Sequence, residues 1–395
     1  MKVLMIPSTM LPFPPVKGGA VQNLIKSYIE YNETTGNHQV TVLSAYDSAA
    51  YEEAKAYKLC DVDFVRVPQV FFKMRDSNVS FFSRVGFKLI HFYYLKRIVR
   101  LIKSKYKEYD KIILDNTPQF ATEVYKVFGK RICIHIYNDY LNTETYNIKG
   151  ILDTCSVVVT VSDYISNSVF KTGLIEQNRV ITLHNGVDLD KFGTKKSKER
   201  RDNLRQDLGI SDDDFVYIFV ARLVPEKGIK ELIEAFNALN NDKAHLVIVG
   251  NKLYSGNITD PFLMELKALA EKNKERIHFT GYISYDELPD YYTMADVGVL
   301  PSLYEEPFAL AAIEYMASGL AVILSDAGGF PEMAEGNAAI VVKRGSRFVE
   351  SLTREMNRVY MDPELYAILS KNGFAKSREF SSLNYCEGLE KIISL

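Results

Sequence analysis

The sequence contains few features that would assign it to a membrane, a secreted or a metal-thiolate class of protein. Its 395 residues include only four cysteines, which are scattered and form no CxxC pair: Cys60, Cys133, Cys155 and Cys386. We therefore expect buried free thiols in a reducing cytoplasm. No apolar run approaches the roughly 20 residues of a membrane-spanning helix. The N-terminal segment "MKVLMIPS" lacks a cleavable signal pattern, so a cytoplasmic location is predicted.

A large charge of one sign is also missing. Lys and Arg number 48 against 50 Asp and Glu, for a formal net charge of −2. This balance gives no global reason to expect a nucleic-acid partner, and none is predicted. The chain contains neither a P-loop nor a GxGxxG motif. The two most common phosphate-binding fingerprints are thus excluded.

The chain does contain a repeated alternation of short apolar runs and amphipathic stretches. Strands are predicted at "KVLMIP", "QVTVLSA", "DKIILDN", "RICIHIY" and "SVVVTVS", and again at "FVYIFVA", "HLVIVG", "RIHFTGY", "DVGVLPS" and "AVILSDA". Helices are predicted near 20–31, 119–127, 228–239, 261–273, 286–293 and 308–318. Near-continuous apolar strands flanked by helices indicate parallel sheets that are covered on both faces. We predict an α/β protein with two doubly wound Rossmann-like domains facing a cleft.

A change of composition indicates where these domains meet. The segment "GTKKSKERRDNLRQDLGISDDD" is charged and poor in large apolar residues. We expect a first domain over 1–190, a linker region over 191–214 and a second domain over 215–375. The final segment, 376–395, is expected to form a helix that packs back on the first domain. The acidic "SDDD" precedes a strand instead of ending one, so a solvated turn is favoured over a metal site.

Two loops after strands are candidates for binding phosphate. In "IFVARLVPEKGIKELIEAF", Arg222 and Lys227 flank a loop that leads into a helix starting near Gly228. A guanidinium fork, an ammonium and a helix N-terminus together make an anion site, although two solvated surface cations are the alternative. The paired Gly18 and Gly19 after the first strand would let the backbone approach a phosphate closely. Such a pair is more often only a turn.

The stretch "YEEPFALAAIEYMASGLAVI" places two acids, Glu306 and Glu314, beside an apolar run. On a single helix they would lie about 12 Å apart along the axis, too far for a pair that shares a proton. We place Glu306 in the loop after a strand, with Pro307 at the first helical position and Phe308 to Ala317 helical. Two hydroxyl-binding acids on either side of a phosphate-facing helix start match a nucleotide sugar.

These motifs together resemble the retaining glycosyltransferases with the GT-B fold, of the family-4 (glycosyl transferases group 1) type. The resemblance covers nearly the whole chain and is strongest over 181–332. It is carried by "HNGVDLDKF", "ARLVPEKG", "FTGYISYDEL", "PSLYEEPFALAAIEYMASGLAVI" and "SDAGGFPE". It implies that 1–190 binds the acceptor and that 215–375 binds the nucleotide sugar.

The resemblance also implies roles for individual residues. Glu306 would hold the donor sugar and Glu314 the nucleotide ribose, while Arg222 and Lys227 would bind the diphosphate. His135 would reach the transferred sugar, although from its position alone it is a core or strand-end histidine. Further donor contacts are implied for Gly18, Gly19, Gly281, Tyr282, Ile283, Phe308, Ala309 and Leu310.

Two departures from the family pattern bear on the donor sugar. Ala309 stands where the family usually has glycine, and "IYND" after His135 lacks the usual acidic neighbour.

The implied mechanism needs no nucleophilic residue, no metal and no cofactor. The diphosphate leaves with its charge stabilised by Arg222 and Lys227, and it takes the proton of the acceptor hydroxyl. A UDP-sugar is the preferred donor, and a glycan or lipid-linked molecule is the expected acceptor in polysaccharide biosynthesis.

One surface segment suggests a membrane partner. Residues 71–107 hold ten Lys or Arg against the single acid Asp76, with Phe and Tyr interleaved. This composition is typical of a peripheral contact with an anionic membrane, here on its cytoplasmic face, or of a solvated basic helix whose aromatics face the core.

Two alternatives to a transferase also stay open. One is an inactive homologue that acts as a binding or chaperone subunit. The other is a related enzyme, such as a sugar-nucleotide epimerase or a phosphorylase.

Overall fold

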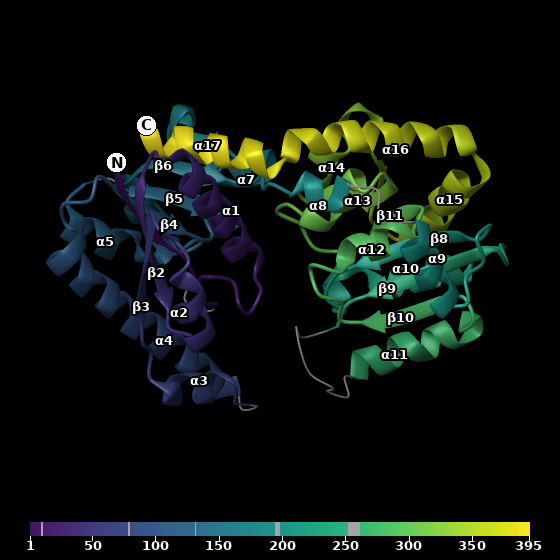
Figure 1. Cartoon of the computed structure of the whole chain (residues 1–395), viewed down its shortest axis with the longest axis horizontal. Helices are drawn as coiled ribbons and strands as arrows, with labels where there is room; N and C mark the ends of the chain where they lie inside the picture. Colours follow the sequence, from purple (N-terminus) through teal and green to yellow (C-terminus); the bar gives the residue numbers. More distant parts are fainter. Residues whose placement is uncertain (9–10, 78–79, 131, 194–197, 252–260) are drawn as a thin grey trace. The chain divides into compact units, whose positions relative to one another are not determined.

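The computed structural model describes residues 1–8, 11–77, 80–130, 132–193, 198–251 and 261–395. These residues form two compact units. Unit 1 comprises Met1–Asn185 and Ser382–Leu395, and unit 2 comprises Gly186–Ser381. The described strands form one sheet of 7 strands and one of 6, with helices packed against them (Figure 1). All of the strand pairs in both sheets are parallel. The predicted α/β class with two doubly wound sheets is confirmed.

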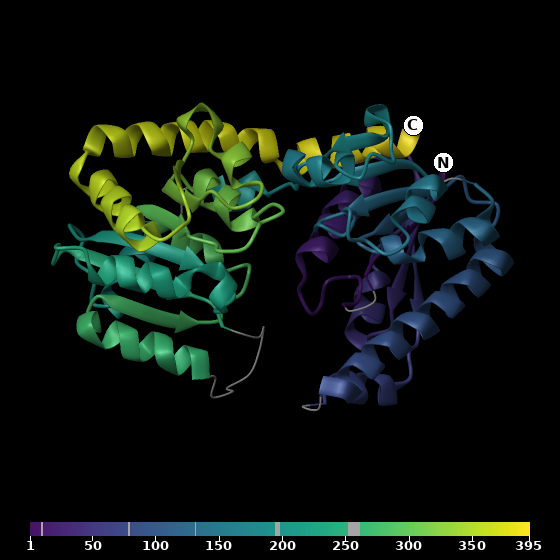
Figure 2. The ribbon, with the colours of Figure 1, turned by 180° about the vertical axis from the view of Figure 1, so that it is seen from behind.

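The sheet of unit 1 has the strand order β3-β2-β1-β4-β5-β6-β7. Its strands are β1 (Lys2–Ile6), β2 (Gln39–Ala45), β3 (Cys60–Val65), β4 (Lys111–Asp115), β5 (Ile132–Ile136), β6 (Cys155–Thr160) and β7 (Val180–Thr182). Its helices are α1 (Ala20–Thr35), α2 (Ser48–Ala54), α3 (Gln69–Arg75), α4 (Ser80–Leu101), α5 (Ala121–Phe128), α6 (Ile148–Thr154), α7 (Asp163–Phe170) and α17 (Ser382–Ser394). Figures 1 and 2 show α1 on one side of this sheet and α4 and α5 on the other. Because both faces are covered, every residue from Val3 to Ile6 is fully buried.

The sheet of unit 2 has the order β10-β9-β8-β11-β12-β13. Its strands are β8 (Phe215–Val220), β9 (Ala244–Val249), β10 (Ile277–Gly281), β11 (Val297–Leu300), β12 (Ala321–Ser325) and β13 (Ile340–Val342). Its helices are α8 (Leu189–Gly193), α9 (Lys198–Asp207), α10 (Ile229–Asn237), α11 (Pro261–Ala270), α12 (Leu288–Thr293), α13 (Leu310–Ala317), α14 (Phe330–Met333), α15 (Phe348–Met361) and α16 (Pro363–Ser377). Helix α10 packs against α11 and α15, and α13 packs against α16.

Local capping signals explain where several helices begin and end. The Ser162 hydroxyl accepts a hydrogen bond from the backbone N–H of Ile165 at the start of α7, at 3.2 Å. The Asp362 carboxylate does the same for Leu365 in α16, at 2.9 Å. Gly129 ends α5 in the left-handed conformation. These are the residue types that satisfy free backbone groups at helix ends.

The sequence prediction missed several elements of regular structure. Strand β3 has the sequence CDVDFV, in which two acids interrupt the apolar run. Strands β7 and β13 are only three residues long. Helices α15 and α16 were also not predicted. Short or charge-interrupted strands such as these depend on pairing with a neighbour, which a local pattern does not reveal.

Residues 191–193 and 198–214 are the described part of the segment that the sequence suggested as a linker. They belong to unit 2, where α9 packs against α12. Arg205 on α9 is only 1% exposed. Its guanidinium donates hydrogen bonds to the carbonyl oxygens of Met294 at 2.8 Å and Asp214 at 2.9 Å. One buried arginine whose donors are satisfied by carbonyl groups therefore ties this charged segment to the unit. The chain re-enters unit 1 at Ser382, where α17 packs against α1.

Candidate functional site

The candidate donor site lies at the point in unit 2 where the strand order reverses. From the neighbouring strands β8 and β11, the chain continues outward to β9 and β10 on one side and to β12 and β13 on the other. Loops after two such strands diverge and leave a crevice at the carboxyl edge of the sheet. The loop after β8 carries Arg222 and Lys227, and the loop after β11 carries Ser302, Tyr304 and Glu306.

Glu306 is the centre of a buried polar cluster at this edge. It is 3% exposed, and the Lys227 ammonium lies 2.7 Å from its Oε1 atom. The Ser302 hydroxyl also donates to Oε1, and the Tyr304 hydroxyl donates to Oε2 at 2.7 Å. Lys227 reaches Tyr304 as well, with a distance of 3.2 Å between Nζ and the hydroxyl oxygen. The carboxylate is therefore held in one orientation by three side chains.

Two glycines allow the loops to approach one another closely enough for this cluster to form. Gly228 has a φ of +69°, and a Cβ atom there would collide with the carbonyl oxygen of Pro301. Gly328 has a φ of +52°, and a Cβ atom there would collide with the backbone of Glu306. The N–H of the adjacent Gly329 donates to the Glu306 carbonyl at 2.7 Å. Side chains other than hydrogen at these two positions would displace the loops.

Arg344, which follows β13, braces the loop that carries Glu306. Its guanidinium donates to the carbonyl of Leu303 at 2.9 Å, to Glu305 at 2.8 Å and to Asp326 at 2.8 Å. The other Glu305 oxygen accepts a hydrogen bond from the N–H of Gly328. Sequence reasoning missed Arg344, because a single arginine after a short strand carries no motif. The hydroxyls of Ser302 and Tyr304 were also missed, although their closeness to Glu306 in the sequence was a usable signal.

Glu314 lies further along, on helix α13, and is 4% exposed. Its Oε2 atom accepts a hydrogen bond from the Tyr292 hydroxyl at 2.7 Å. Burial raises the pKa of Glu314 from 4.5 to about 7, while the Tyr292 hydrogen bond and the charge of Lys191 oppose the rise. The prediction of a helix from Phe308 was wrong by two residues. Helix α13 begins at Leu310, so neither Glu306 nor Pro307 belongs to it.

The three residues that follow Pro307 differ from one another in environment. Phe308 is 8% exposed and packs edge-on against Phe380, with 5.5 Å between ring centroids. Ala309 caps the helix with an extended backbone, at φ −103° and ψ 112°, and not with the helical geometry we expected. Leu310 is half-buried. The Phe308 ring is thus part of the core, and only its backbone is available for the predicted donor contact.

A pocket of about 230 Å³ opens beside Arg222. It is lined by Val220, Ala221, Arg222, Val249, Gly250, Asn251, Tyr282, Ile283 and Leu288. The structure therefore brings Arg222 together with Tyr282 and Ile283, two residues for which the resemblance implies donor contacts. Gly281 starts this loop, and its carbonyl accepts a hydrogen bond from the N–H of Gly250 at 2.8 Å. The lining is mostly apolar with one exposed cation, which suits a flat ring next to an anionic group.

The remaining predicted residues lie in unit 1. Gly18 and Gly19 precede α1 with φ values of +71° and +113°. His135 is 0% exposed on β5. Its Nδ1 atom lies 2.9 Å from the Tyr137 hydroxyl and 3.3 Å from Asp115 Oδ1, and its Nε2 atom has no hydrogen-bond partner among the described residues. The structure places His135 in the core of unit 1, and its contact with a sugar stays a prediction from the resemblance.

The "SDDD" segment forms a turn before β8, as expected. The N–H of Ser211 bonds to the Asp214 carboxylate at 2.9 Å. Within the described ranges, no group of three or more His, Cys, Asp or Glu side chains is arranged to hold a metal ion. Nor does any helix in the described part of the chain combine the length and the apolar character that crossing a membrane requires.

Comparison with known proteins finds a family model and relatives that match this chain. Residues 200–376 match the family model for glycosyl transferases group 1. The chain is 28% identical to the Bacillus subtilis (strain 168) protein YtcC over 378 residues, covering 94% of this chain and 86% of that protein. It is 33% identical to the lipopolysaccharide 1,2-N-acetylglucosaminetransferase of Salmonella typhimurium over 189 residues, covering 47% of this chain and 49% of that one.

Solved structures show the same fold over the full length. Anabaena Alr3699/HepE in complex with UDP aligns with a TM-score of 0.77 at 20% identity and covers 100% of both chains. The same protein in complex with UDP-glucose aligns with a TM-score of 0.73 at 20% identity, covering 100% of this chain and 99% of the other. The chain is therefore similar to the glycosyl transferases group 1 family over residues 200–376, and it has the GT-B fold.

Proposed function

We propose that this protein is a retaining glycosyltransferase that moves a sugar from a nucleotide-diphosphate sugar to a hydroxyl group of a glycan or lipid-linked acceptor, in polysaccharide biosynthesis. The observation that carries this proposal is the buried Glu306–Lys227 pair at the reversal point of the sheet in unit 2. UDP is the proposed nucleotide. The complexes of Alr3699/HepE with UDP and UDP-glucose support that choice.

The hydrogen-bonding capacity left over in the cluster fits such a donor. A carboxylate offers about four acceptor positions, and Glu306 uses three of them for Lys227, Ser302 and Tyr304. The fourth, on Oε2, can accept a hydroxyl proton of the donor sugar. An ammonium has three donors, and Lys227 uses two for Glu306 and Tyr304. The third can point to a phosphate oxygen, together with the exposed guanidinium of Arg222.

The proposed reaction exchanges one bond at the anomeric carbon for another. The bond from this carbon to the diphosphate oxygen breaks, and the acceptor hydroxyl forms a new bond on the same face. The leaving phosphate takes the hydroxyl proton. Fixed positive charges at Arg222 and Lys227 stabilise the diphosphate as its charge develops, which is the electrostatic contribution expected of preorganised groups. Neither a protein nucleophile nor a metal ion is part of this proposal.

Thermal unfolding with a panel of UDP-, GDP-, ADP- and dTDP-sugars and their free nucleotides, in chelator-treated buffer, tests the donor assignment. A ligand at 100 times its dissociation constant adds about 2.7 kcal/mol to the free energy of unfolding. We expect stabilisation by UDP and UDP-sugars. A folded protein that responds to none of them would refute the donor site and favour an inactive binding subunit.

Transfer itself is tested with Glu306→Gln and Arg222→Ala. Glu306→Gln should abolish transfer and leave UDP stabilisation within a few degrees of wild type, because Gln still accepts from Lys227. Arg222→Ala should reduce both transfer and UDP binding. Full turnover in either variant would remove that residue from the mechanism. NMR of the product sugar distinguishes retention from inversion, and a change in the donor sugar without an acceptor would identify an epimerase instead.

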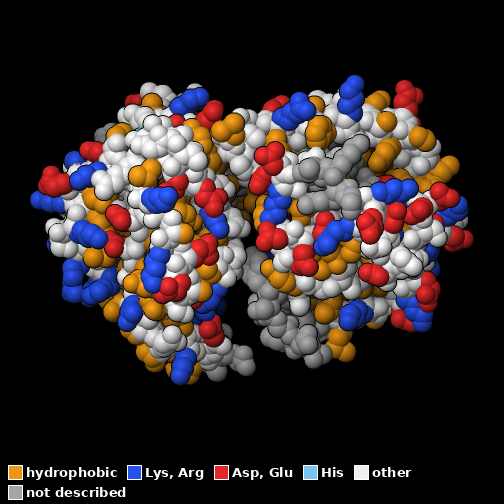
Figure 3. Space-filling model, viewed as in Figure 1, with side chains coloured by type: hydrophobic (Ala, Val, Ile, Leu, Met, Phe, Trp, Pro, Cys, Tyr) orange, Lys and Arg blue, Asp and Glu red, His pale blue; other side chains and the backbone are white. Residues whose placement is uncertain are grey.

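We also propose that α4 contacts an anionic membrane. Its exposed face carries Phe81, Phe82 and Phe92, which are 67%, 49% and 57% exposed, and the Lys96 ammonium lies over the Phe92 ring at 4.2 Å. Figure 3 shows Lys, Arg and hydrophobic side chains mixed over this part of unit 1. Such a face suits anionic lipid. Neutralising Lys96, Arg97, Arg100 and Lys103 should reduce flotation with anionic vesicles, and equal flotation would refute the contact.

A further inference from the structure

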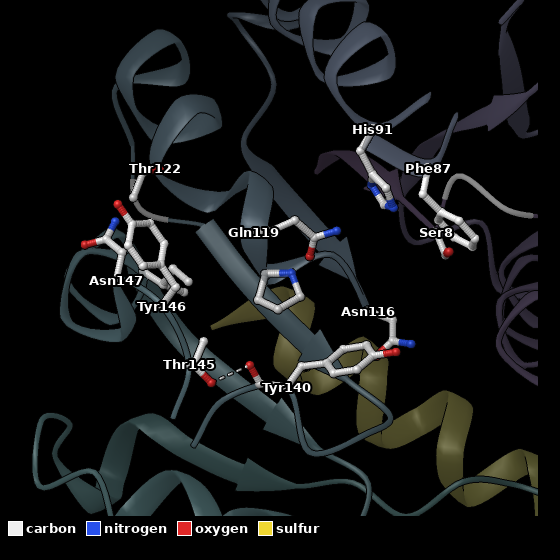
Figure 4. Close-up of a pocket in the computed structure, with 12 residues that line it drawn as sticks. Ser8, Phe87, His91, Asn116, Gln119, Thr122, Tyr140, Thr145, Tyr146 and Asn147 are labelled. Carbon is white, nitrogen blue, oxygen red and sulfur yellow. Dashed lines mark hydrogen bonds between the residues drawn. The ribbon is translucent and has the colours of Figure 1, made fainter. Parts of the chain in front are cut away.

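Unit 1 has its own point of strand-order reversal, and a pocket of about 520 Å³ lies there. The neighbouring strands β1 and β4 lead outward to β2 and β3 on one side and to β5 and β6 on the other. Ser8 follows β1, Asn116 follows β4 and Tyr140 comes after β5, and all three line the pocket (Figure 4). Pockets of about 300–1,000 Å³ at such a position are typical binding sites for small molecules.

The lining of this pocket combines apolar surface with several polar side-chain groups and carries no fixed charge. Its described lining residues are Ser8, Phe87, His91, Asn116, Pro118, Gln119, Thr122, Tyr140, Thr145, Tyr146, Asn147 and Ile151. None of them is Asp, Glu, Lys or Arg. Burial lowers the pKa of the one weakly basic group, His91, so that it is neutral at physiological pH. A phosphate or carboxylate would lose its hydration there and gain no opposite charge, so the pocket favours an uncharged ligand.

Several lining side chains have hydrogen-bonding groups that the rest of the described chain does not use. Gln119 and Thr122 make no side-chain hydrogen bond among the described residues. Asn116 accepts from the N–H of Tyr137 through Oδ1 at 3.2 Å, which leaves its two amide N–H donors for a ligand. A primary amide presents a donor and an acceptor side by side. Figure 4 shows Gln119 between the group around His91 and the group around Thr122. Adjacent hydroxyls of a sugar ring match this arrangement.

Aromatic rings surround these polar groups. Phe87, Tyr140 and Tyr146 are 40%, 49% and 94% exposed, so their rings do not serve mainly as core. The loop that presents both tyrosines is held by its own side chains. The Thr145 hydroxyl donates to the Tyr140 carbonyl at 3.0 Å (Figure 4). It also accepts from the N–H of Asn142 at 3.0 Å. Exposed aromatic rings beside free amides suit the apolar C–H face and the polar edge of a pyranose.

The backbone around the pocket is also unusual. Three non-glycine residues of the described chain have a positive φ, and two of them, Asn116 at 57° and Asn147 at 55°, line this pocket. The N–H of Asn116 is held by the carbonyl of His135 at 2.7 Å. Sparsely populated backbone conformations cluster at sites where side chains must be aimed at a ligand.

We infer that this pocket is a carbohydrate subsite that takes an uncharged pyranose unit through Asn116, Gln119 and Thr122, with Tyr140 and Phe87 against the ring. In assigning that unit to the acceptor, the inference rests on the proposed function. It narrows the acceptor to one whose sugar at this subsite bears no phosphate, sulfate or carboxylate. A diphosphate that joins such a sugar to a lipid would lie outside the pocket.

Binding of free sugars to the full chain without donor tests this subsite. The probes are methyl α- and β-glycosides of glucose, galactose and N-acetylglucosamine, with glucose 6-phosphate and glucuronate as charged analogues, titrated by saturation-transfer NMR. We expect at least one neutral glycoside to bind, and the charged analogues to bind at least about tenfold more weakly. Equal or tighter binding of the charged analogues would overturn the inference, and so would the absence of binding by every neutral probe.

Substitutions of pocket residues test whether the glycoside binds in this pocket. Gln119→Ala should weaken it about three- to tenfold, the range for one hydrogen bond between neutral groups, and Tyr140→Ala should weaken it further. Gln177→Ala and Tyr125→Ala make the same changes at exposed positions of unit 1 outside the pocket and should bind as wild type. Binding that neither pocket variant alters would overturn the location. Stabilisation by UDP in the same samples separates the two proposals. Glycoside binding without stabilisation by UDP would support the subsite and refute the donor site. Stabilisation by UDP without glycoside binding would support the donor site and refute the subsite.

Discussion

Replacing Glu314 with glutamine should raise the free energy of unfolding above that of the wild type, and this difference should grow as the pH rises. Glu314 is 4% exposed, and its hydrogen-bond donor in the described chain is the neutral Tyr292 hydroxyl. Burial raises the pKa of the carboxyl group from 4.5 to about 7. Glutamine has nearly the same shape, still accepts from Tyr292 and carries no charge at any pH. The substitution therefore removes the cost of ionising a buried group and little else.

The sign and size of the effect follow from the two pKa values. Below pH 4.5 the carboxyl group is protonated in both the folded and the unfolded chain. Between pH 4.5 and 7 the unfolded chain ionises first, so the free energy of unfolding of the wild type falls as the pH rises. At about 1.4 kcal/mol per pKa unit, the full loss above pH 7 is roughly 3 kcal/mol. The variant lacks this loss.

Urea unfolding of wild type and Glu314→Gln at several pH values between 5 and 8.5 measures the difference. We expect the advantage of the variant to grow with pH and to approach about 3 kcal/mol at the upper end. Glu275→Gln, the same change at an exposed site in unit 2, should show no such trend. An advantage that does not depend on pH, or a variant that is less stable at pH 8, would refute the reasoning, because the buried carboxylate would then be ionised at no cost.

If Glu314 holds the nucleotide ribose, its protonation should be coupled to donor binding. Ribose hydroxyls that donate to Glu314 favour its ionised form. UDP binding should then release protons between about pH 6 and 7, and calorimetry in buffers of different ionisation enthalpy measures this release. The Glu314→Gln variant should bind UDP more weakly and release fewer protons, because only the terminal phosphate of UDP still titrates in this range. Equal proton release in both proteins would place the titrating group elsewhere.

Three further predictions concern stability. Lys227→Ala leaves Glu306 buried without its cation and should lower the free energy of unfolding by about 3 kcal/mol, most of which the double variant with Glu306→Gln should recover in the same denaturation assay. Gly328→Ala adds a Cβ against the Glu306 backbone at a positive φ, so a melt should show destabilisation of at least about 2 kcal/mol; an unchanged melting temperature would contradict the close approach. Burial and the neighbouring His245 lower the pKa of His278 from 6.5 to about 4. Protonation therefore destabilises the fold as the pH drops through that window, and His278→Gln should flatten this dependence, whereas identical pH profiles would refute it.

Much of the fold could be predicted because its signals are local. Near-continuous apolar runs such as QVTVLSA and FVYIFV form strands within a residue or two of their predicted limits. Glycine pairs, caps and the acids of the loop after β11 could be read in the same way. The missed elements lack such signals. Strand β3 carries two acids, and α9 reads as a linker because its one buried residue, Arg205, is an arginine.

The sequence by itself determined which residue types stand at the strand ends, and through them the fold class and the nucleotide-sugar hypothesis. Only the tertiary structure decided how these residues work together. Lys227 and Glu306 are 79 positions apart and meet because β8 and β11 are neighbours in the sheet. Likewise, the pocket of unit 1 gathers residues from separate loops and from α4. Charge pairing, the raised pKa of Glu314 and the shape of a pocket depend on distance and burial, which arise only when segments far apart in the sequence pack together.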